Sequence, residues 1–104
     1  MYHVYMKKNK LIVCADGFTM SVQANEDAYC SPRIDNAEHY EAAEVGFPSE
    51  HEPLLMEWAE NRNSPTTTVY CWVPAARVSL VCAKHGGIVS GELPNGIAYL
   101  AAEA

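Results

Sequence analysis

The sequence predicts an α+β fold: a mainly antiparallel β-sheet with hairpins, and one well-formed helix packed on one face. A hairpin pattern surrounds Asp16-Gly17, and residues 66–89 read as a strand, a helix and a helix stop. The chain has 104 residues, of which 49% are hydrophobic and 19% charged. A chain of this length and composition can bury one core and is too apolar for disorder. We therefore expect a single globular domain over residues 1–104.

The first quarter of the chain carries the hairpin. Alternation over residues 2–6 predicts a short strand, and residues 11–15 predict a second one. Asp16-Gly17 is typical of a type I′ turn, which needs positive φ at both central residues. Residues 18–24 then alternate strictly, with apolar side chains at every second position. That period of two favours a half-buried strand.

Residues 25–41 show no period and predict a long loop, which in a compact domain is often functional. Within it, the run from Tyr29 to Arg33 combines an aromatic ring, a thiol, a proline turn and a cation. The alternative is a packed turn in which Tyr29 covers the core. Residues 42–47 predict a third strand, and its apolar side chains, Phe47 included, are expected to point inward.

A short helix is predicted at about residues 50–60. Ser49 and Glu52 have the spacing of a capping box, and Pro53 is tolerated in a first helical turn. Trp58 lies among the apolar residues that this segment would bury.

Residues 66–73 are β-branched and aromatic, which predicts a strand, and a helix is expected at about 74–85. The helix would bury one mostly apolar stripe, formed by Val78, Val81, Cys82 and His85. Gly86-Gly87 would end it. A period of two places Tyr70 and Trp72 on the face opposite Val69, Cys71 and Val73. Pro94-Asn95-Gly96 predicts a terminal hairpin between residues 88–93 and 97–100.

The net charge of −6 is unevenly distributed. Between residues 26 and 60 the only cation is Arg33, and the acids are Glu26, Asp27, Asp35, Glu38, Glu41, Glu44, Glu50, Glu52, Glu57 and Glu60. Such a field repels nucleic acid and attracts basic surfaces. The basic residues cluster only at Lys7, Lys8 and Lys10, so direct nucleic-acid binding is not expected. The alternative is that the acids only keep the domain soluble.

The cysteines predict a reduced, cytoplasmic protein. Cys14, Cys30, Cys71 and Cys82 form no C-x-x-C pair, and all but Cys30 lie in apolar periodic segments. Cys30 is therefore expected to be the most exposed thiol. Cys82 and His85 are close enough on one helix to touch, but both fall on the stripe that faces the core. We expect a packed cysteine and a histidine that favours the helix C-terminus, rather than a catalytic pair.

Other chemistry lacks a recognisable pattern. His39-x-Glu41 and Glu50-His51-Glu52 supply metal-ligand types, but neither has the spacing of a known metal site. There is no phosphate loop and no dinucleotide fingerprint. No apolar run is long enough for a bilayer span, and the first ten residues lack the layout of a secretory signal. We expect no enzyme activity, no metal, no cofactor and no membrane partner.

The chain holds more aromatic residues than one small core needs, and several stand among acids. Aromatic side chains ringed by charge are typical of protein-binding surfaces. The predicted partner-binding residues are Tyr29, Arg33, Glu38, Tyr40, Glu41, Glu44, Trp58 and Trp72. For Arg33 the simplest expectation is pairing with the acids around it. The expected partner is a protein with a basic surface, and a second copy of the chain is the alternative.

Three segments resemble small uncharacterised proteins encoded by bacteriophages and prophages. They are DGFTMSVQA with YCSPR, EVGFPSE with EPLLMEWAE, and SPTTTVYCWVP with KHGGI. Together they cover most of residues 16–89, and the motifs are typical of folds and turns rather than of catalysis. The resemblance implies a bacterial host cell. By analogy of size and charge, it suggests an inhibitor of a host defence protein, as anti-CRISPR proteins are.

The sequence therefore predicts a small acidic protein that binds a host protein and inhibits it. One alternative is a protein that sequesters a small ligand with the 29–33 loop. Another is a structural or accessory component of a virion.

Overall fold

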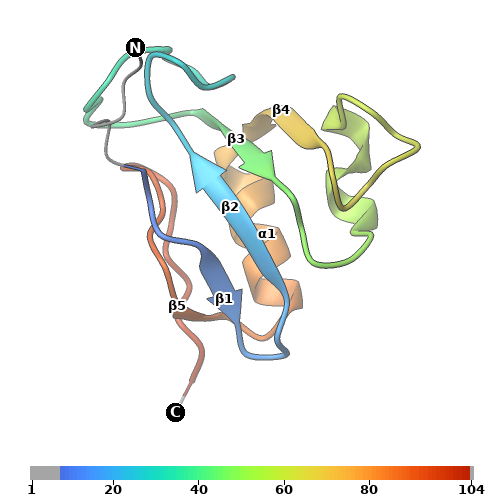
Figure 1. Ribbon diagram of the computed structural model, residues 1–104. Coiled ribbons are helices and arrows are strands. Elements are labelled where there is room, and N and C mark those ends of the chain that lie inside the picture. Colours follow the sequence, from blue (N-terminus) through green and yellow to red (C-terminus); the bar gives the residue numbers. More distant parts are fainter. Residues whose placement is uncertain (1–7, 104) are drawn as a thin grey trace.

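A computed structural model describes residues 8–103 (Figure 1), so the strand predicted at residues 2–6 lies outside the described residues. Along the chain the elements are β1 (Ile12–Cys14), β2 (Thr19–Gln23), β3 (Ala42–Gly46), the 3₁₀ helix η1 (Pro53–Trp58), β4 (Val69–Pro74), α1 (Ala75–Lys84) and β5 (Ile88–Ser90). None of the helices described is long and apolar enough to cross a membrane.

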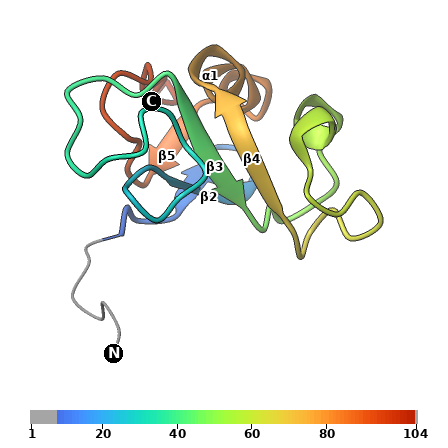
Figure 2. The same cartoon turned by 90° about the horizontal axis from the view of Figure 1, so that it is seen from above.

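The five strands form one antiparallel sheet in the order β4-β3-β2-β1-β5. Helix α1 connects the two edge strands and covers one face of the sheet, and η1 lies beside the β4 edge (Figure 2). Over residues 8–103, no helix covers the opposite side of β2, β3 and β4, which we call the outer face. The predicted α+β class, with a mainly antiparallel sheet and one main helix, is confirmed.

The hairpin predicted at Asp16-Gly17 forms, but with a different turn. Met20 pairs with Ile12, and Phe18, Met20 and Val22 are all buried on the side of α1. The turn is not of the predicted type I′, because Gly17 has a positive φ, 94°, whereas Asp16 does not. The Gly17 amide donates to the Cys14 carbonyl at 2.9 Å and the Cys14 amide to the Phe18 carbonyl at 2.8 Å, so the loop has three residues and ends in a left-handed glycine. The Asp16 carboxylate also accepts a hydrogen bond from the Phe18 amide at 2.9 Å, which fixes the exit from the turn.

Helix α1 also follows the predicted pattern. The stripe of Val78, Val81, Cys82 and His85 is buried against the sheet. His85 caps the helix, and the Gly87 amide then donates to the Cys82 carbonyl at 2.8 Å, with φ of 91° at Gly87. A glycine is needed here because a β-carbon would lie 2.7 Å from the backbone of Ala102.

The long loop between β2 and β3 folds around a small core of its own. Ala28, Cys30, Ala37 and Tyr40 pack together, apart from the main core. The Tyr40 hydroxyl accepts from the Ala37 amide at 3.1 Å and donates to the Ile34 carbonyl at 2.7 Å. These internal bonds hold the loop as a packed unit although it has no regular secondary structure.

Two expectations about strand faces are wrong. Phe47 was expected to point inward, but it follows the end of β3 with a φ of 49° and is 57% exposed. The left-handed turn at Phe47 rotates its side chain outward, and Pro48 takes the buried position instead.

The second error concerns β4, where strict alternation fails. Tyr70 pairs with Val45 and Val73 with Ala43, so three residue steps of β4 oppose two of β3. The extra residue makes a bulge, and Trp72 lies in it with a φ of 53°. As a result Tyr70 and Val73 both point inward, while Trp72 is 48% exposed.

Two further predictions need correction. The C-terminal segment forms no hairpin: Ile97 is buried in the core, and the chain returns to a parallel bridge between Ile88 and Ala101. The helix expected at 50–60 is shorter and of the 3₁₀ type. Ser49 accepts from the Thr19 amide rather than capping a helix, and Glu52 itself caps η1 by accepting from the Leu54 amide.

Candidate functional site

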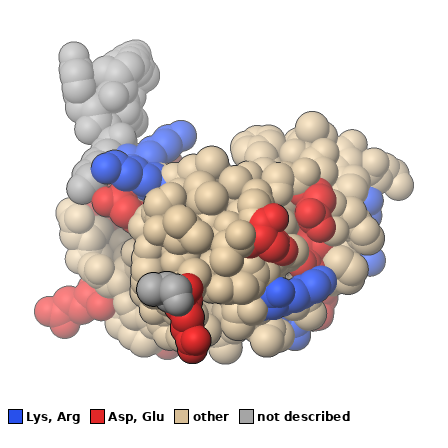
Figure 3. Space-filling view, turned by 90° about the horizontal axis from the view of Figure 1, so that it is seen from below, with Lys and Arg blue, Asp and Glu red and all other residues tan. Residues whose placement is uncertain are grey.

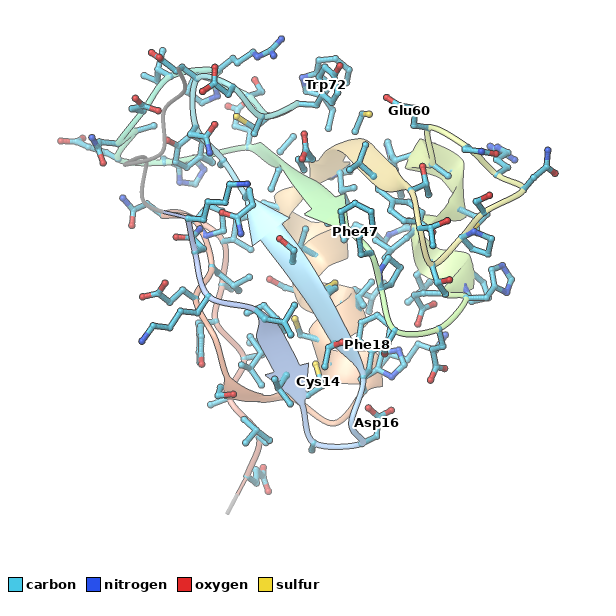
Figure 4. The ribbon with its side chains drawn as sticks, viewed as in Figure 1. Cys14, Asp16, Phe18, Phe47, Glu60 and Trp72 are labelled. Atoms are coloured by element: carbon cyan, nitrogen blue, oxygen red, sulfur yellow. The ribbon has the colours of Figure 1, made fainter. Side chains whose placement is uncertain are left out.

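One group of side chains gathers on the outer face, at the end of β4. We call it the outer-face site; its members are Tyr29, Arg33, Glu44, Glu60, Cys71 and Trp72. Figure 4 shows Trp72 and Glu60 at one end of the sheet, with Phe47 further along the same side of the molecule. The long loop, β3, the segment after η1, and β4 all contribute to this site.

Two hydrogen bonds to the long loop hold Trp72. Its backbone amide donates to the Tyr29 carbonyl at 3.0 Å, and its indole Nε1 donates to the Cys30 carbonyl at 3.2 Å. The ring lies against the ring of Tyr29, with centroids 5.2 Å apart and planes tilted by 46°. The indole is therefore fixed in position although about half of it faces solvent.

The sequence led us to expect that Arg33 pairs with the acids around it, but within residues 8–103 it forms no salt bridge. Its guanidinium donates from Nε to the Glu26 carbonyl at 3.1 Å and from Nη2 to the Asp27 carbonyl at 3.5 Å. The same group lies 5.2 Å from the centroid of the Tyr29 ring. Arg33, Tyr29 and Trp72 thus form a row of side chains in contact, which keeps the loop against β4.

Carboxylates lie near this row of side chains. Glu44 accepts from the Tyr29 amide through Oε1 at 3.0 Å, while the side chain of Glu60 is exposed. Burial raises the pKa of the Cys71 thiol, and the negative charges of Glu60 and Glu44 raise this pKa further. Both carboxylates therefore act on one point of β4, next to Trp72. Sequence reasoning missed Glu60, because nothing local shows that the segment after η1 returns to β4.

A second cluster, the His85 network, lies at the other end of the sheet, where Figure 4 labels Asp16 and Phe18. His85 Nδ1 lies 2.6 Å from Asp16 Oδ2, and Nε2 lies 2.6 Å from Glu52 Oε1. Lys84 Nζ donates to Glu52 Oε2 at 2.8 Å. The Phe18 ring stacks on the imidazole, with centroids 4.0 Å apart. The network joins the hairpin turn, the start of η1 and the end of α1.

The hydrogen bonds and charges of this network favour the charged forms of His85, Glu52 and Asp16. Burial opposes the positive charge on His85, but the hydrogen bonds that the imidazole donates to Asp16 and Glu52 outweigh it and raise its pKa. Burial would raise the pKa of Glu52, but Lys84, the Leu54 amide and His85 together lower it. The Phe18 amide and then His85 lower the pKa of Asp16. The arrangement is that of an imidazolium between two carboxylates.

This geometry suits structure better than catalysis. Both imidazole nitrogens are engaged, and His85 is 5% exposed while Glu52 is 1% exposed. A general base needs a free nitrogen within reach of a substrate proton. Figure 3, which shows the molecule from the end where the hairpin turn lies, has acidic and basic side chains both at its surface.

The thiols differ from expectation in one respect. All four cysteines are free. Cys30 was expected to be the most exposed, but it is 2% exposed, because the loop closes around it and its Sγ lies 3.2 Å from the Asn25 carbonyl. Cys71 is the only partly exposed thiol. Burial raises the pKa of Cys82 to about 12, so no thiolate is available beside His85.

The remaining predicted partner-binding residues are scattered. Glu38 and Glu41 are exposed on the long loop, outside the outer-face site. Tyr40 is buried in the small core of that loop, which removes it from the surface. Trp58 is half-buried on η1, and the Arg77 guanidinium lies 5.0 Å from its ring centroid. Only Tyr29, Arg33, Glu44 and Trp72 come together, and their role in binding stays a prediction.

Comparisons with protein-family models, with curated protein sequences and with solved structures find no match. The part of the chain that the structure describes contains no group of three or more His, Cys, Asp or Glu side chains placed to hold a metal ion. Function must therefore be argued from the two clusters themselves.

Proposed function

We propose that this chain is a non-enzymatic binding protein whose acidic half, residues 26–60, engages a basic surface of a partner protein. One observation carries the proposal. Of the ten acids in that half, only Glu52 takes part in a salt bridge within residues 8–103. Most of the others are exposed. A surface charge that is not neutralised internally attracts an oppositely charged partner and speeds association.

The exposed aromatic residues support a protein partner rather than simple counter-ions. Trp72 and Phe47 are large, about half exposed, and lie on the same side of the molecule (Figure 4). Tryptophan and other aromatic residues supply much of the binding energy in protein interfaces, where acidic groups mainly provide steering and specificity. The acidic surface and the exposed aromatic residues together therefore favour a basic protein, rather than a nucleic acid, as the partner.

The identity of the partner is the narrower part of the proposal. We infer a bacterial host protein, inhibited by direct contact as an anti-CRISPR protein would inhibit its target. This step rests on the resemblance of three sequence segments to phage-encoded proteins and on the analogy of size and charge. The alternative of small-ligand binding by the 29–33 loop is less favoured, because two donors of Arg33 already bind carbonyls of its own loop. The alternative of a virion component has no specific observation behind it.

Selection from a library of random peptides tests the proposal without a known partner. We expect the immobilised protein to enrich peptides rich in arginine and lysine, and added salt to weaken their binding. A matched variant with Glu38→Gln, Glu41→Gln and Glu57→Gln removes three exposed charges, and we expect less enrichment with it. Enrichment of neutral or acidic peptides, or of none, would contradict the proposal.

A further inference from the structure

We propose that the outer-face site holds the side chain of an arginine from the partner protein, with its guanidinium against the indole of Trp72 and beside Glu60 and Glu44. This inference rests on the proposed function, because it names the group that the acidic half would recognise. It follows from three features of the site. Within residues 8–103, no cation lies over the Trp72 ring, Glu44 and Glu60 have no cationic partner, and hydrogen bonds already hold the indole in one orientation.

The first feature is the unused ring. Over the described part of the chain, two aromatic rings have an arginine over them: Arg33 lies 5.2 Å from the Tyr29 centroid and Arg77 lies 5.0 Å from the Trp58 centroid. Trp72 has no such cation among residues 8–103, although it is 48% exposed. Tryptophan is the aromatic side chain that attracts cations most strongly. Its free surface is therefore suited to a cation from outside.

The second feature is the negative charge beside that ring. Within the described residues, neither Glu44 nor Glu60 forms a salt bridge. Glu44 uses one oxygen for the Tyr29 amide, and Glu60 is exposed. The Glu60 amide donates to the Val69 carbonyl at 2.9 Å, which ties this residue to β4, and Figure 4 shows Glu60 at the same end of the sheet as Trp72. The charges of both glutamates also act on the thiol of Cys71, the residue that precedes Trp72. A cation at this point would gain attraction from two carboxylates, whereas an anion would be repelled.

The third feature is the fixed orientation of the indole. Trp72 is held by its amide and its Nε1, and its left-handed backbone directs the side chain away from the core. A side chain that is already ordered loses little entropy when a ligand binds to it. Residues held in sparsely populated backbone conformations, as Trp72 is, cluster at active sites and ligand-binding sites.

Arginine fits these features better than lysine. Its planar guanidinium can stack on an indole and present parallel N–H groups to a carboxylate, whereas an ammonium group is compact and strongly hydrated. We therefore expect the site to prefer arginine. A nucleic acid is disfavoured by the same carboxylates, and a second copy of the chain becomes an outcome that the experiment can detect.

The experiment uses short arginine-rich peptides and matched peptides with citrulline in place of arginine, which keeps the shape and removes the charge. In a Trp58→Phe background, the fluorescence of Trp72 reports binding directly. We expect the arginine peptide to bind roughly threefold to tenfold more tightly than its citrulline match, at constant peptide length. Glu60→Gln should weaken arginine binding, because it removes one of the two charges beside the ring. Glu103→Gln removes one exposed carboxylate outside the acidic half, and we expect it to have little effect.

The outcomes separate this inference from the proposed function. Binding to Trp72→Leu, which lacks the fluorescent reporter, is measured by calorimetry. If basic peptides bind but Trp72→Leu and Glu60→Gln change nothing, the arginine site is wrong and the acidic half still binds elsewhere. If no basic peptide binds at all, both proposals fail. If Trp72 fluorescence changes only with protein concentration, a second copy occupies the site and the inference is overturned. Glu60→Gln breaks no hydrogen bond of the described structure, so its result does not depend on whether Trp72→Leu folds.

Discussion

The two clusters of this protein treat charge in opposite ways. In the His85 network each carboxylate has a cationic partner, and His85 and Glu52 are almost fully buried. In the outer-face site Glu44 and Glu60 have no cationic partner within residues 8–103, and the largest ring is about half exposed. The contrast teaches that a neutralised cluster holds elements together, whereas an unneutralised one is available to a partner.

The largest effect is expected where the His85 network is broken. His85→Ala leaves Glu52 buried with one cation fewer, and also removes the ring that stacks on Phe18. We expect the free energy of unfolding to fall by about 3–5 kcal/mol, as is typical when one partner of a buried ion pair is removed. Urea denaturation measures the loss. Leu80→Ala, at an exposed position of the same helix, is the control and should change stability by about 0.5 kcal/mol or less.

If His85→Ala and Leu80→Ala lowered the free energy of unfolding by the same small amount, the His85 network would not hold the three elements together. The contrast between the two clusters would then fail.

A second effect of the network is a dependence of stability on pH. The pKa of His85 is raised above its ordinary value of 6.5, so its contribution is complete below that pH and is lost as pH rises through the raised pKa. The pKa values of Asp16 and Glu52 lie below their ordinary 3.8 and 4.5, so their contribution is complete above pH 4.5 and is lost as pH falls through the lowered values.

The stabilisation by the network should therefore be largest between about pH 4.5 and 6.5, given those ordinary values. The difference in unfolding free energy between the wild-type protein and His85→Gln measures it, because the effects of the other acids cancel. A difference that grows steadily above pH 8 would contradict an imidazolium in the network.

Local signals predicted the parts of the fold that depend on neighbouring residues. Asp16-Gly17 marked the hairpin, and Gly86-Gly87 marked the end of α1. The same signals failed where strands from distant parts of the chain meet. The bulge at Trp72 depends on pairing with β3, and the left-handed turn at Phe47 depends on Pro48 filling the core.

The candidate sites follow the same rule. Tyr29, Arg33, Glu44 and Trp72 were singled out by residue type, and the long loop brings them together. Glu60 was not, because it reaches the site through tertiary structure. The His85 network was missed as a unit, since its members come from three elements that are far apart in sequence.

A smaller effect is expected at Phe47, which lies on the same side of the molecule as the outer-face site. Its φ of 49° is unfavourable for any residue with a β-carbon, and its ring is 57% exposed. Phe47→Gly should therefore be more stable than Phe47→Ala by about 1 kcal/mol, because only glycine relieves the left-handed conformation. Thermal or urea unfolding of the two variants measures the difference. If Phe47→Ala were the more stable of the two, the left-handed backbone conformation at Phe47 would not lower the stability of the protein.

The most direct test of the account is to map where an arginine-rich peptide binds. We predict that backbone amide chemical shifts, followed during titration of the labelled protein, change most at Tyr29, Glu44, Glu60 and residues 70–73. Asp16, Glu52 and His85 should stay unchanged at low peptide concentration, because their charges are already neutralised. Changes concentrated at the His85 network, or spread evenly over the acidic surface, would contradict the assignment of binding to the outer face.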